Sequence, residues 1–234
     1  MTDNGPAEDL DGLIRRVDPD RWLTSRFIGD PSARADVIAL YAYDYELARA
    51  RRAASTPLLA EIRLTWWREV LDQIYGETPV RRHPTAQALA GVVARRALPR
   101  ALLEAMIDGQ IEALELAAFD AAAAVAWADA VQGSAARAAA LILHPAGKAA
   151  LTAAAGRAWG LALLRRAGLA PAEAVAGPLR AALDEAAAAA RSLSPAALPA
   201  ALPARLARFD LAGRPAGPLA KRLSLLAAVL GGQV

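Results

Sequence analysis

The sequence contains no cysteine, only two histidines, and few aromatic residues. The absence of cysteine excludes a disulfide framework, a thiolate metal site and a cysteine nucleophile. Two histidines, His83 and His144, argue against a histidine-based metal site or a Ser-His-Asp triad. No run of about 18 residues is both apolar and uncharged, so the sequence predicts no transmembrane helix. The polar, acidic start, MTDNGPAEDLDG, is not typical of a signal peptide.

Alanine is abundant, at 63 of 234 residues, and the chain is 56% hydrophobic. Because alanine is the best helix former and no segment alternates with a period of two, the sequence predicts an all-α fold. The net charge of +3 permits an anionic partner without requiring one. No helix-turn-helix, RNP or zinc motif is present, so we expect no nucleic-acid partner. We expect a cytoplasmic location, with peripheral attachment to the inner membrane as an open alternative.

Prolines divide the chain into helical segments. Residues 1–17 are predicted to form a flexible lead-in, and residues 18–234 a single helical domain, a bundle with short loops. Prolines at 195, 199 and 203 predict a broken, partly helical connector over 192–206. The expected helices begin at proline or at a capping residue such as Thr56 or Asp120. They span about 31–54, 57–75, 84–97, 99–118, 120–143, 145–166, 171–191 and 218–231.

The most informative segment is residues 39–76. Within the first helix expected there, Tyr41, Tyr45, Ala48 and Arg52 fall on one stripe, at helical spacing. One interpretation is a partly buried face whose hydroxyl groups and guanidinium reach water. The other is the wall of a cavity. The sequence alone leaves both open.

The order of four segments resembles the squalene/phytoene synthase family over roughly residues 20–230. These segments are YAYDYELARARR at 41–52, HPTAQAL at 83–89, ALPRALLEAMIDGQIEAL at 97–114 and GRAWGLALLRR at 156–166. The resemblance implies the all-helical isoprenoid synthase fold. It also implies head-to-head joining of two polyprenyl diphosphates, with Mg²⁺ held by aspartates on two facing helices.

The chain departs from that family where the metal would bind. Laid on the first family motif, the aspartate positions are Ala48, Arg49 and Arg52. In the second motif Arg165 matches the family's arginine, and Arg166 stands at the aspartate that follows it. Since Mg²⁺ requires oxygen ligands, we expect no catalytic residue, no metal ligand and no resident cofactor. An active Mg²⁺-dependent prenyltransferase of this family stays the alternative.

Four other acids are candidate substitutes for the missing aspartates. They form a stripe on the helix expected at 99–118, away from its apolar face, which favours a solvated surface over a metal site. These acids are Glu104, Asp108, Glu112 and Glu115.

The resemblance extends to a branch of the family that acts in mitochondria as an assembly factor for respiratory complex I. YAYDYELAR and EIRLTWWREVLDQIYG are closer to that branch than to true synthases. We therefore predict a non-catalytic family member that acts in assembly of a membrane respiratory complex or binds an isoprenoid lipid. A plain lipid-binding bundle is a further interpretation, and the oligomeric state stays open.

The candidate binding residues form one expected cavity wall. Arginine makes bidentate hydrogen bonds to phosphate, so a prenyl diphosphate or an anionic lipid headgroup could bind there without metal. The alternative is that Arg49 and Arg52 extend to solvent and pair with nearby acids. The five candidate residues are Tyr41, Tyr45, Arg49, Arg52 and Arg165.

Overall fold

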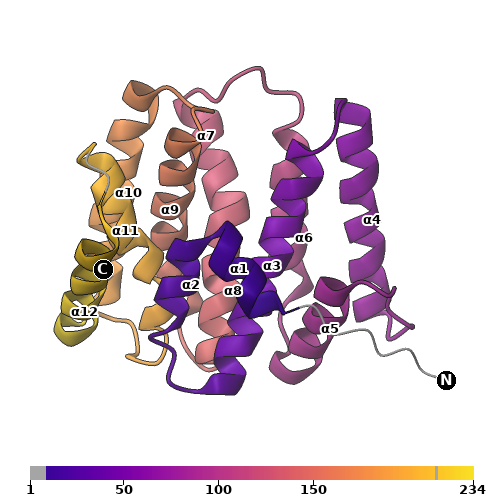
Figure 1. Ribbon diagram of the computed structural model, residues 1–234, viewed down its shortest axis with the longest axis horizontal. Helices are drawn as coiled ribbons and strands as arrows, with labels where there is room; N and C mark the ends of the chain where they lie inside the picture. The colour runs from indigo at the N-terminus through magenta and orange to yellow at the C-terminus, as the bar shows by residue number, and fades with distance from the viewer. Residues whose placement is uncertain (1–8, 214–215) are drawn as a thin grey trace.

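The computed structural model describes residues 9–213 and 216–234, and within these ranges it contains helices and no strand (Figure 1). The all-α prediction is therefore confirmed. The helices are α1 (Leu10–Val17), α2 (Pro19–Ser25), α3 (Pro31–Arg52), α4 (Pro57–Tyr75), α5 (Pro84–Arg96), α6 (Arg100–Glu112), α7 (Ala121–Trp127), the π-helix η1 (Ala128–Gly133), α8 (Ser134–Leu143), the 3-10 helix η2 (Ala149–Thr152), α9 (Ala153–Arg166), α10 (Ala172–Ala190), the 3-10 helix η3 (Leu198–Ala200), α11 (Leu202–Leu211) and α12 (Pro218–Gly231).

Side-chain caps and prolines set the helix starts. Asp30 accepts hydrogen bonds from the first N–H groups of α3, and Thr56 does so for α4; each cap is followed by proline at the first helical position. Asp120 caps α7 in the same way through the N–H of Ala123. Caps of this kind satisfy N–H groups that have no partner within the helix. They explain why most helix starts could be predicted from sequence.

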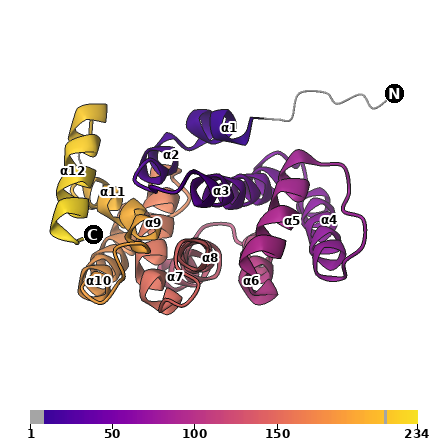
Figure 2. The same ribbon diagram turned by 90° about the horizontal axis from the view of Figure 1, so that it is seen from below.

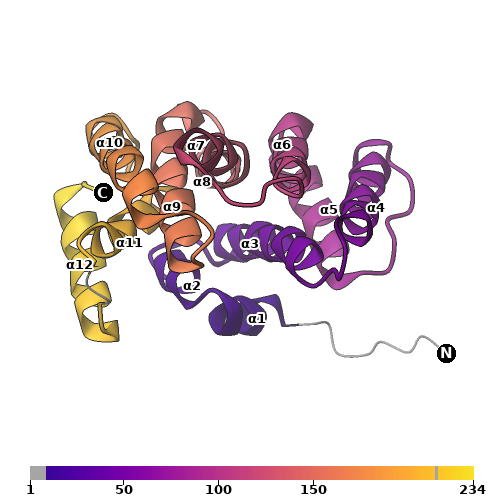
Figure 3. The same cartoon turned by 90° about the horizontal axis from the view of Figure 1, so that it is seen from above.

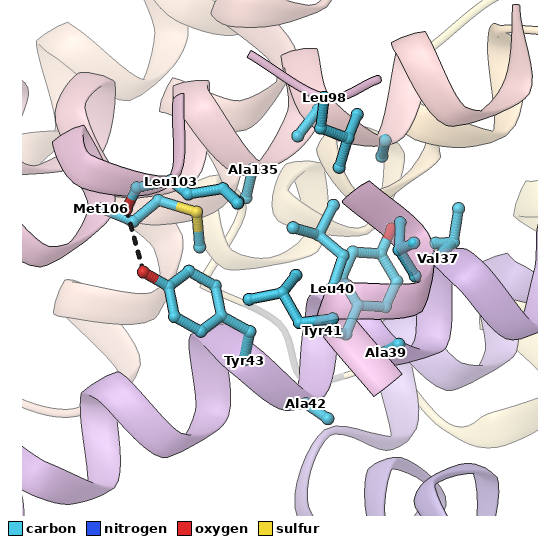
Figure 4. Close-up of a cluster of buried hydrophobic side chains, with 14 of the residues drawn as sticks. Val37, Ala39, Leu40, Tyr41, Ala42, Tyr43, Leu98, Leu103, Met106 and Ala135 are labelled. Atoms are coloured by element: carbon cyan, nitrogen blue, oxygen red, sulfur yellow. Dashed lines mark hydrogen bonds between the residues drawn. The ribbon is translucent and has the colours of Figure 1, made fainter. Parts of the chain in front are cut away.

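The helices enclose two apolar cores. One is built mainly from α3, α4, α5, α6 and α8, and the other from α7, η1 and α9–α12. In the first core the buried Tyr43 hydroxyl donates to the carbonyl oxygen of Leu103, at 3.0 Å, and so ties α3 to α6 (Figure 4). The long α3 runs through the middle of the molecule, while α4 and α12 lie at opposite ends (Figures 2 and 3).

The N-terminal segment differs from the expected flexible lead-in over residues 1–17. Residues 10–17 form α1, because Asp9 accepts a hydrogen bond from the N–H of Gly12 and because Leu13 and Ile14 are buried. Residues 1–8 lie outside the described residues. An N-cap followed by an apolar pair is enough to fix a short helix that packs on a larger one.

Two other segments also differ from expectation. The helix expected over 120–143 is divided into α7, η1 and α8, and the one expected from 145 begins only at η2 and α9. The connector over 192–206 is partly helical, as predicted: it contains η3 and the start of α11. Pro203 lies in the first turn of α11, where a missing N–H costs nothing. Within the described ranges, none of the helices is both long and apolar enough to cross a membrane.

Candidate functional site

A buried arginine, Arg21, joins three helical elements. Asp18 caps α2 through the N–H of Arg21 at 3.0 Å, and its second oxygen accepts from Arg21 Nε at 2.5 Å. Arg21 Nη2 donates to Asp44 Oδ2 at 2.7 Å, and Nη1 donates to Gln132 Oε1 at 3.2 Å. Gln132 Nε2 in turn donates to both oxygens of Asp44, at 3.1 and 3.0 Å. This network fixes α2, α3 and η1 relative to one another.

The surroundings of Arg21 favour its charged form. Burial alone would lower the pKa of Arg21, but Asp18 and Asp44 outweigh it and raise that pKa above its ordinary value. The guanidinium lies 4.6 Å from the ring centroid of Tyr41, a cation–π arrangement. Burial raises the pKa of Tyr41 to about 12, against the opposing effect of Arg21. Tyr41 is therefore a buried, neutral residue that packs against the charged guanidinium of Arg21.

A second network ties α2 to the C-terminal helices. Asp20 accepts from Arg166 Nη1 at 3.0 Å and from Lys221 Nζ at 2.6 Å. Arg166 also makes a bidentate pair with Asp210, at 2.5 and 2.6 Å, and lies 4.6 Å from the ring centroid of Trp159. Burial opposes the charge of Arg166, but Asp210 and Asp20 raise its pKa above its ordinary value.

A cavity of about 400 Å³ opens between these two networks. Helix α3 provides one wall, α6 and the α7–η1 segment a second, and α9 a third. Polar and apolar groups share the lining, which is the usual composition of a small-molecule site. The residues that line the cavity are Val17, Asp18, Pro19, Asp20, Arg21, Asp44, Tyr45, Ala48, Arg51, Arg52, Gln110, Trp127, Gln132, Trp159, Leu163, Leu164, Arg166, Ala167 and Leu169.

Several buried polar groups at this cavity have no hydrogen-bond partner among the described residues. Gln110 is completely buried, yet neither its Nε2 nor its Oε1 has a partner. The same is true of the indole N–H groups of Trp127 and Trp159 and of Arg51 Nε. A buried unpaired polar group costs about 1–3 kcal/mol, so folded proteins keep few of them. Their concentration here gives the cavity unused hydrogen-bonding capacity for a ligand.

Two glycines of α9 allow the close helix contact behind this cavity. A Cβ at Gly156 would lie 2.2 Å from the carbonyl oxygen of Gln132, and one at Gly160 would lie 2.8 Å from the Cβ of Ala128. Only glycine lets α9 pack this closely against η1. The contact brings Trp159 and Gln132 into the same site.

The structure does not bring the five sequence-predicted residues into one wall, which corrects that expectation. Tyr45 and Arg52 line the cavity, together with Ala48 of the same stripe. Tyr41 is on the stripe but covered by Arg21. Arg49 pairs with Glu46 at 3.2 Å on another face, beside Trp66 and His83. Arg165 lines a second hollow next to α12, where Arg166 also lies, and is not among the residues that line the cavity.

The residues at the centre of the site were not predicted from the sequence. They are Asp18, Arg21, Asp44, Gln110 and Gln132. One signal was available for the last two, since each is the only amide side chain of its helix. Gln110 follows Met106 and Leu103 at helical spacing, which places it on the apolar face of α6 although acids lie elsewhere on that helix. A buried amide must find partners, so an isolated glutamine on a core face indicates either a network or a ligand.

The α6 acids lie on the surface, as expected of a solvated face. Asp108 pairs with Arg68 at 2.5 Å and Glu104 with Arg100 at 2.7 Å. Across the described part of the chain, no group of three or more histidine, aspartate or glutamate side chains is placed to hold a metal ion.

Known proteins share this fold, and a family model matches most of the sequence. The family model described as squalene/phytoene synthase matches residues 14–168, well over half of the chain. The chain belongs to the squalene/phytoene synthase family. Over 95% of its length it is similar to a crystal structure of a dehydrosqualene synthase, with a TM-score of 0.76, 16% identity and 94% of that chain covered. The squalene synthase HpnC from Alicyclobacillus acidocaldarius gives a TM-score of 0.67 at 14% identity, with 95% and 92% covered. These likenesses confirm the isoprenoid synthase fold.

A curated relative of this chain has a different description. The chain is 30% identical over 96 residues to the Bos taurus protein described as NADH dehydrogenase (ubiquinone) complex I, assembly factor 6. The match spans 41% of this chain but only 28% of the relative's length.

Proposed function

We propose that this protein is a non-catalytic member of the squalene/phytoene synthase family. In this proposal it binds an anionic isoprenoid lipid in the cavity beside α3 and acts in assembly of a membrane respiratory complex. Its place is the cytoplasmic side of the inner membrane. The observation that carries the proposal is that each carboxylate lining the cavity is already ion-paired with an arginine or lysine side chain.

The donor set of the cavity does not fit Mg²⁺. Of the lining acids, Asp18 and Asp44 are held by Arg21, and Asp20 by Arg166 and Lys221. A magnesium ion needs free oxygen ligands in near-octahedral geometry, and nearby guanidinium groups repel it. Arg52 and Ala48 on the α3 wall add no oxygen donor. We therefore infer that this chain has lost the metal-binding aspartates of the family and that no reaction takes place in the cavity.

The same charges favour an anion. Arg51 and Arg52 lie on the α3 wall, and burial, with a smaller effect of Arg52, lowers the pKa of Arg51. An anionic headgroup would stabilise the charged form of Arg51, which burial and Arg52 disfavour. It would also accept hydrogen bonds from the unpaired donors of Trp127 and Trp159. The apolar part of the lining, which includes Leu163 and Leu164, suits the start of a prenyl tail.

The role in complex assembly rests on the assembly-factor relative. The shared segment is short, and the relative's description names an assembly role. A binding bundle without catalytic carboxylates is compatible with such a role. This part of the proposal is tested separately from ligand binding.

We expect the purified protein to bind farnesyl diphosphate in EDTA, and Arg52→Ala to weaken that binding about tenfold. A hydrogen bond to a charged group is worth about 1.5–3 kcal/mol, and the exposed position of Arg52 places the loss at the low end. Calorimetry with wild type and variant gives the two dissociation constants. Arg180→Ala, an exposed arginine on α10, is the matched control and should bind as wild type.

The variant Gln110→Leu tests whether the Gln110 side chain serves ligand binding or the stability of the free protein. Removing a completely buried, unpaired amide should raise the thermal midpoint of the free protein while weakening binding of the same ligand. Equal binding by wild type and Arg52→Ala, or no binding by wild type, would contradict the proposed site. A condensation product formed with Mg²⁺ and abolished by EDTA would contradict the absence of catalysis.

We expect deletion of the gene in its source organism to lower NADH:quinone oxidoreductase activity severalfold and leave the isoprenoid lipids unchanged. Membrane activity assays, native gels of the complex and lipid extracts provide the readouts. The wild-type gene should restore activity, which controls for effects on neighbouring genes. Normal oxidoreductase activity together with altered isoprenoids would instead support the Mg²⁺-dependent synthase alternative.

A further inference from the structure

The last helix, α12, is apolar on two opposite faces. Its inner face packs Leu225 and Ala228 against α11. On its outer face four leucines are between 48% and 87% exposed, at spacings of four, three and four residues, which places them on one stripe. A helix that is apolar on both sides is expected to be covered on both sides. The four are Leu219, Leu223, Leu226 and Leu230.

The outer face of α12 is open in the described structure. The helix forms one end of the molecule, beyond α11 and far from α4 (Figures 2 and 3). Among the helices that the structure describes, its main packing partner is α11. The leucine stripe therefore faces outward, away from the rest of the bundle.

Positive charge is concentrated in the same part of the chain. Residues 202–234 contain five basic residues and a single acid, so this segment carries more net positive charge than the whole chain, at +3. The single acid, Asp210, is already paired with Arg166. Arg222 is exposed on α12, and Arg165 lines a hollow of about 420 Å³ beside the helix. Lys221 lines the same hollow but is already paired with Asp20 of α2.

We propose that α12 is a docking helix for an anionic lipid surface, with its leucine stripe in the interface and the basic residues at the headgroups. Apolar residues combined with local positive charge are typical of helices that lie in the plane of a membrane surface. At 14 residues and about 21 Å, α12 lies along the surface and does not cross it.

The size of the stripe argues against a second copy of the chain as the occupant. A stable dimer buries roughly 800 Å² of accessible surface per partner, more than one face of a single 14-residue helix about 21 Å long provides by itself. Membrane binding requires no such minimum area, because each leucine that enters the lipid contributes to binding on its own. This proposal specifies which helix contacts the inner membrane. It rests on the proposed function only for the location at that membrane. Its test involves neither the cavity nor the respiratory complex, so the two proposals can fail separately.

The test is co-sedimentation of the full chain with vesicles of phosphatidylcholine alone or mixed with phosphatidylglycerol. We expect binding to the mixed vesicles that weakens as salt is raised. Leu223→Ser/Leu230→Ser should reduce that binding at least about tenfold, because buried apolar area drives interfacial binding. Arg222→Gln should reduce it about fivefold on mixed vesicles only.

The matched control is Leu58→Ser/Ile62→Ser on α4, where the side chains are 65% and 56% exposed at the other end of the molecule. This variant should bind as wild type. All replaced side chains are exposed, so circular dichroism should be unchanged. The proposal is overturned if wild type binds neither vesicle or both equally, or if the α4 variant loses as much binding. It is also overturned if wild type sediments as a dimer that the α12 variant dissociates.

Discussion

Replacement of Arg21 by methionine is expected to lower the free energy of unfolding by about 3–5 kcal/mol, as when one partner of a buried ion pair is removed. Arg21 and Asp44 expose only 5% and 4% of their side chains, so solvent screening does not reduce the effect. Without the guanidinium, Asp44 and Asp18 lose their cation, and Gln132 loses a donor. Urea unfolding followed by circular dichroism measures the change.

Arg26→Met is the matched control, because Arg26 lies at the end of the same helix. Its partner Asp11 is half exposed, and such surface pairs contribute about 0–1 kcal/mol. Adding Asp44→Asn to Arg21→Met should recover part of the loss, because it removes the stranded charge and keeps an amide near Gln132. If Arg21→Met costs no more than Arg26→Met, the buried network does not order the site.

The fold was predictable because its boundaries depend on local signals. Thr56 followed by Pro57 starts α4, and Asp30 followed by Pro31 starts α3, each within a few residues of sequence. The π-helix η1 was not predictable in this way. It lies where Gly156 of α9 approaches the backbone of Gln132, a contact between segments that only the folded chain brings together. Local propensity in an alanine-rich stretch predicts a continuous α-helix there.

The candidate site was predictable only in part, for the same reason. Tyr45, Ala48 and Arg52 share one face of one helix, so their spacing was enough to place them on a common wall. Arg21, Asp44 and Gln132 come from three elements, and Gln132 is 88 residues from Asp44. No local pattern encodes that contact. Arg49 lies about 60° around the helix from Arg52, and this rotation is enough to place it on another face, outside the cavity.

Alanine in place of Gly156 is expected to destabilise the protein by about 3 kcal/mol, the upper part of the range for overpacking. The new Cβ would lie 2.2 Å from the carbonyl oxygen of Gln132 and 2.7 Å from the Cα of Gly133. Both are backbone atoms that cannot change rotamer, so α9 and η1 must move apart. Because that contact positions Trp159 and Gln132, we also expect weaker binding of farnesyl diphosphate. Urea unfolding and calorimetry measure the two effects.

Gly177→Ala is the matched control, and its expected effect is much smaller. Gly177 lies in α10, is exposed, and a Cβ there would meet no atom of another segment within 4 Å. Alanine gains helix propensity, but Pro178 follows it and disfavours a helical backbone at a residue that carries a Cβ, so we expect a net change of less than about 1 kcal/mol. The same substitution thus separates the helix propensity of alanine from the steric demand at the α9–η1 contact. A loss at Gly156 no larger than the change at Gly177 would mean that the two helices can separate freely, and that the cavity does not depend on their close approach.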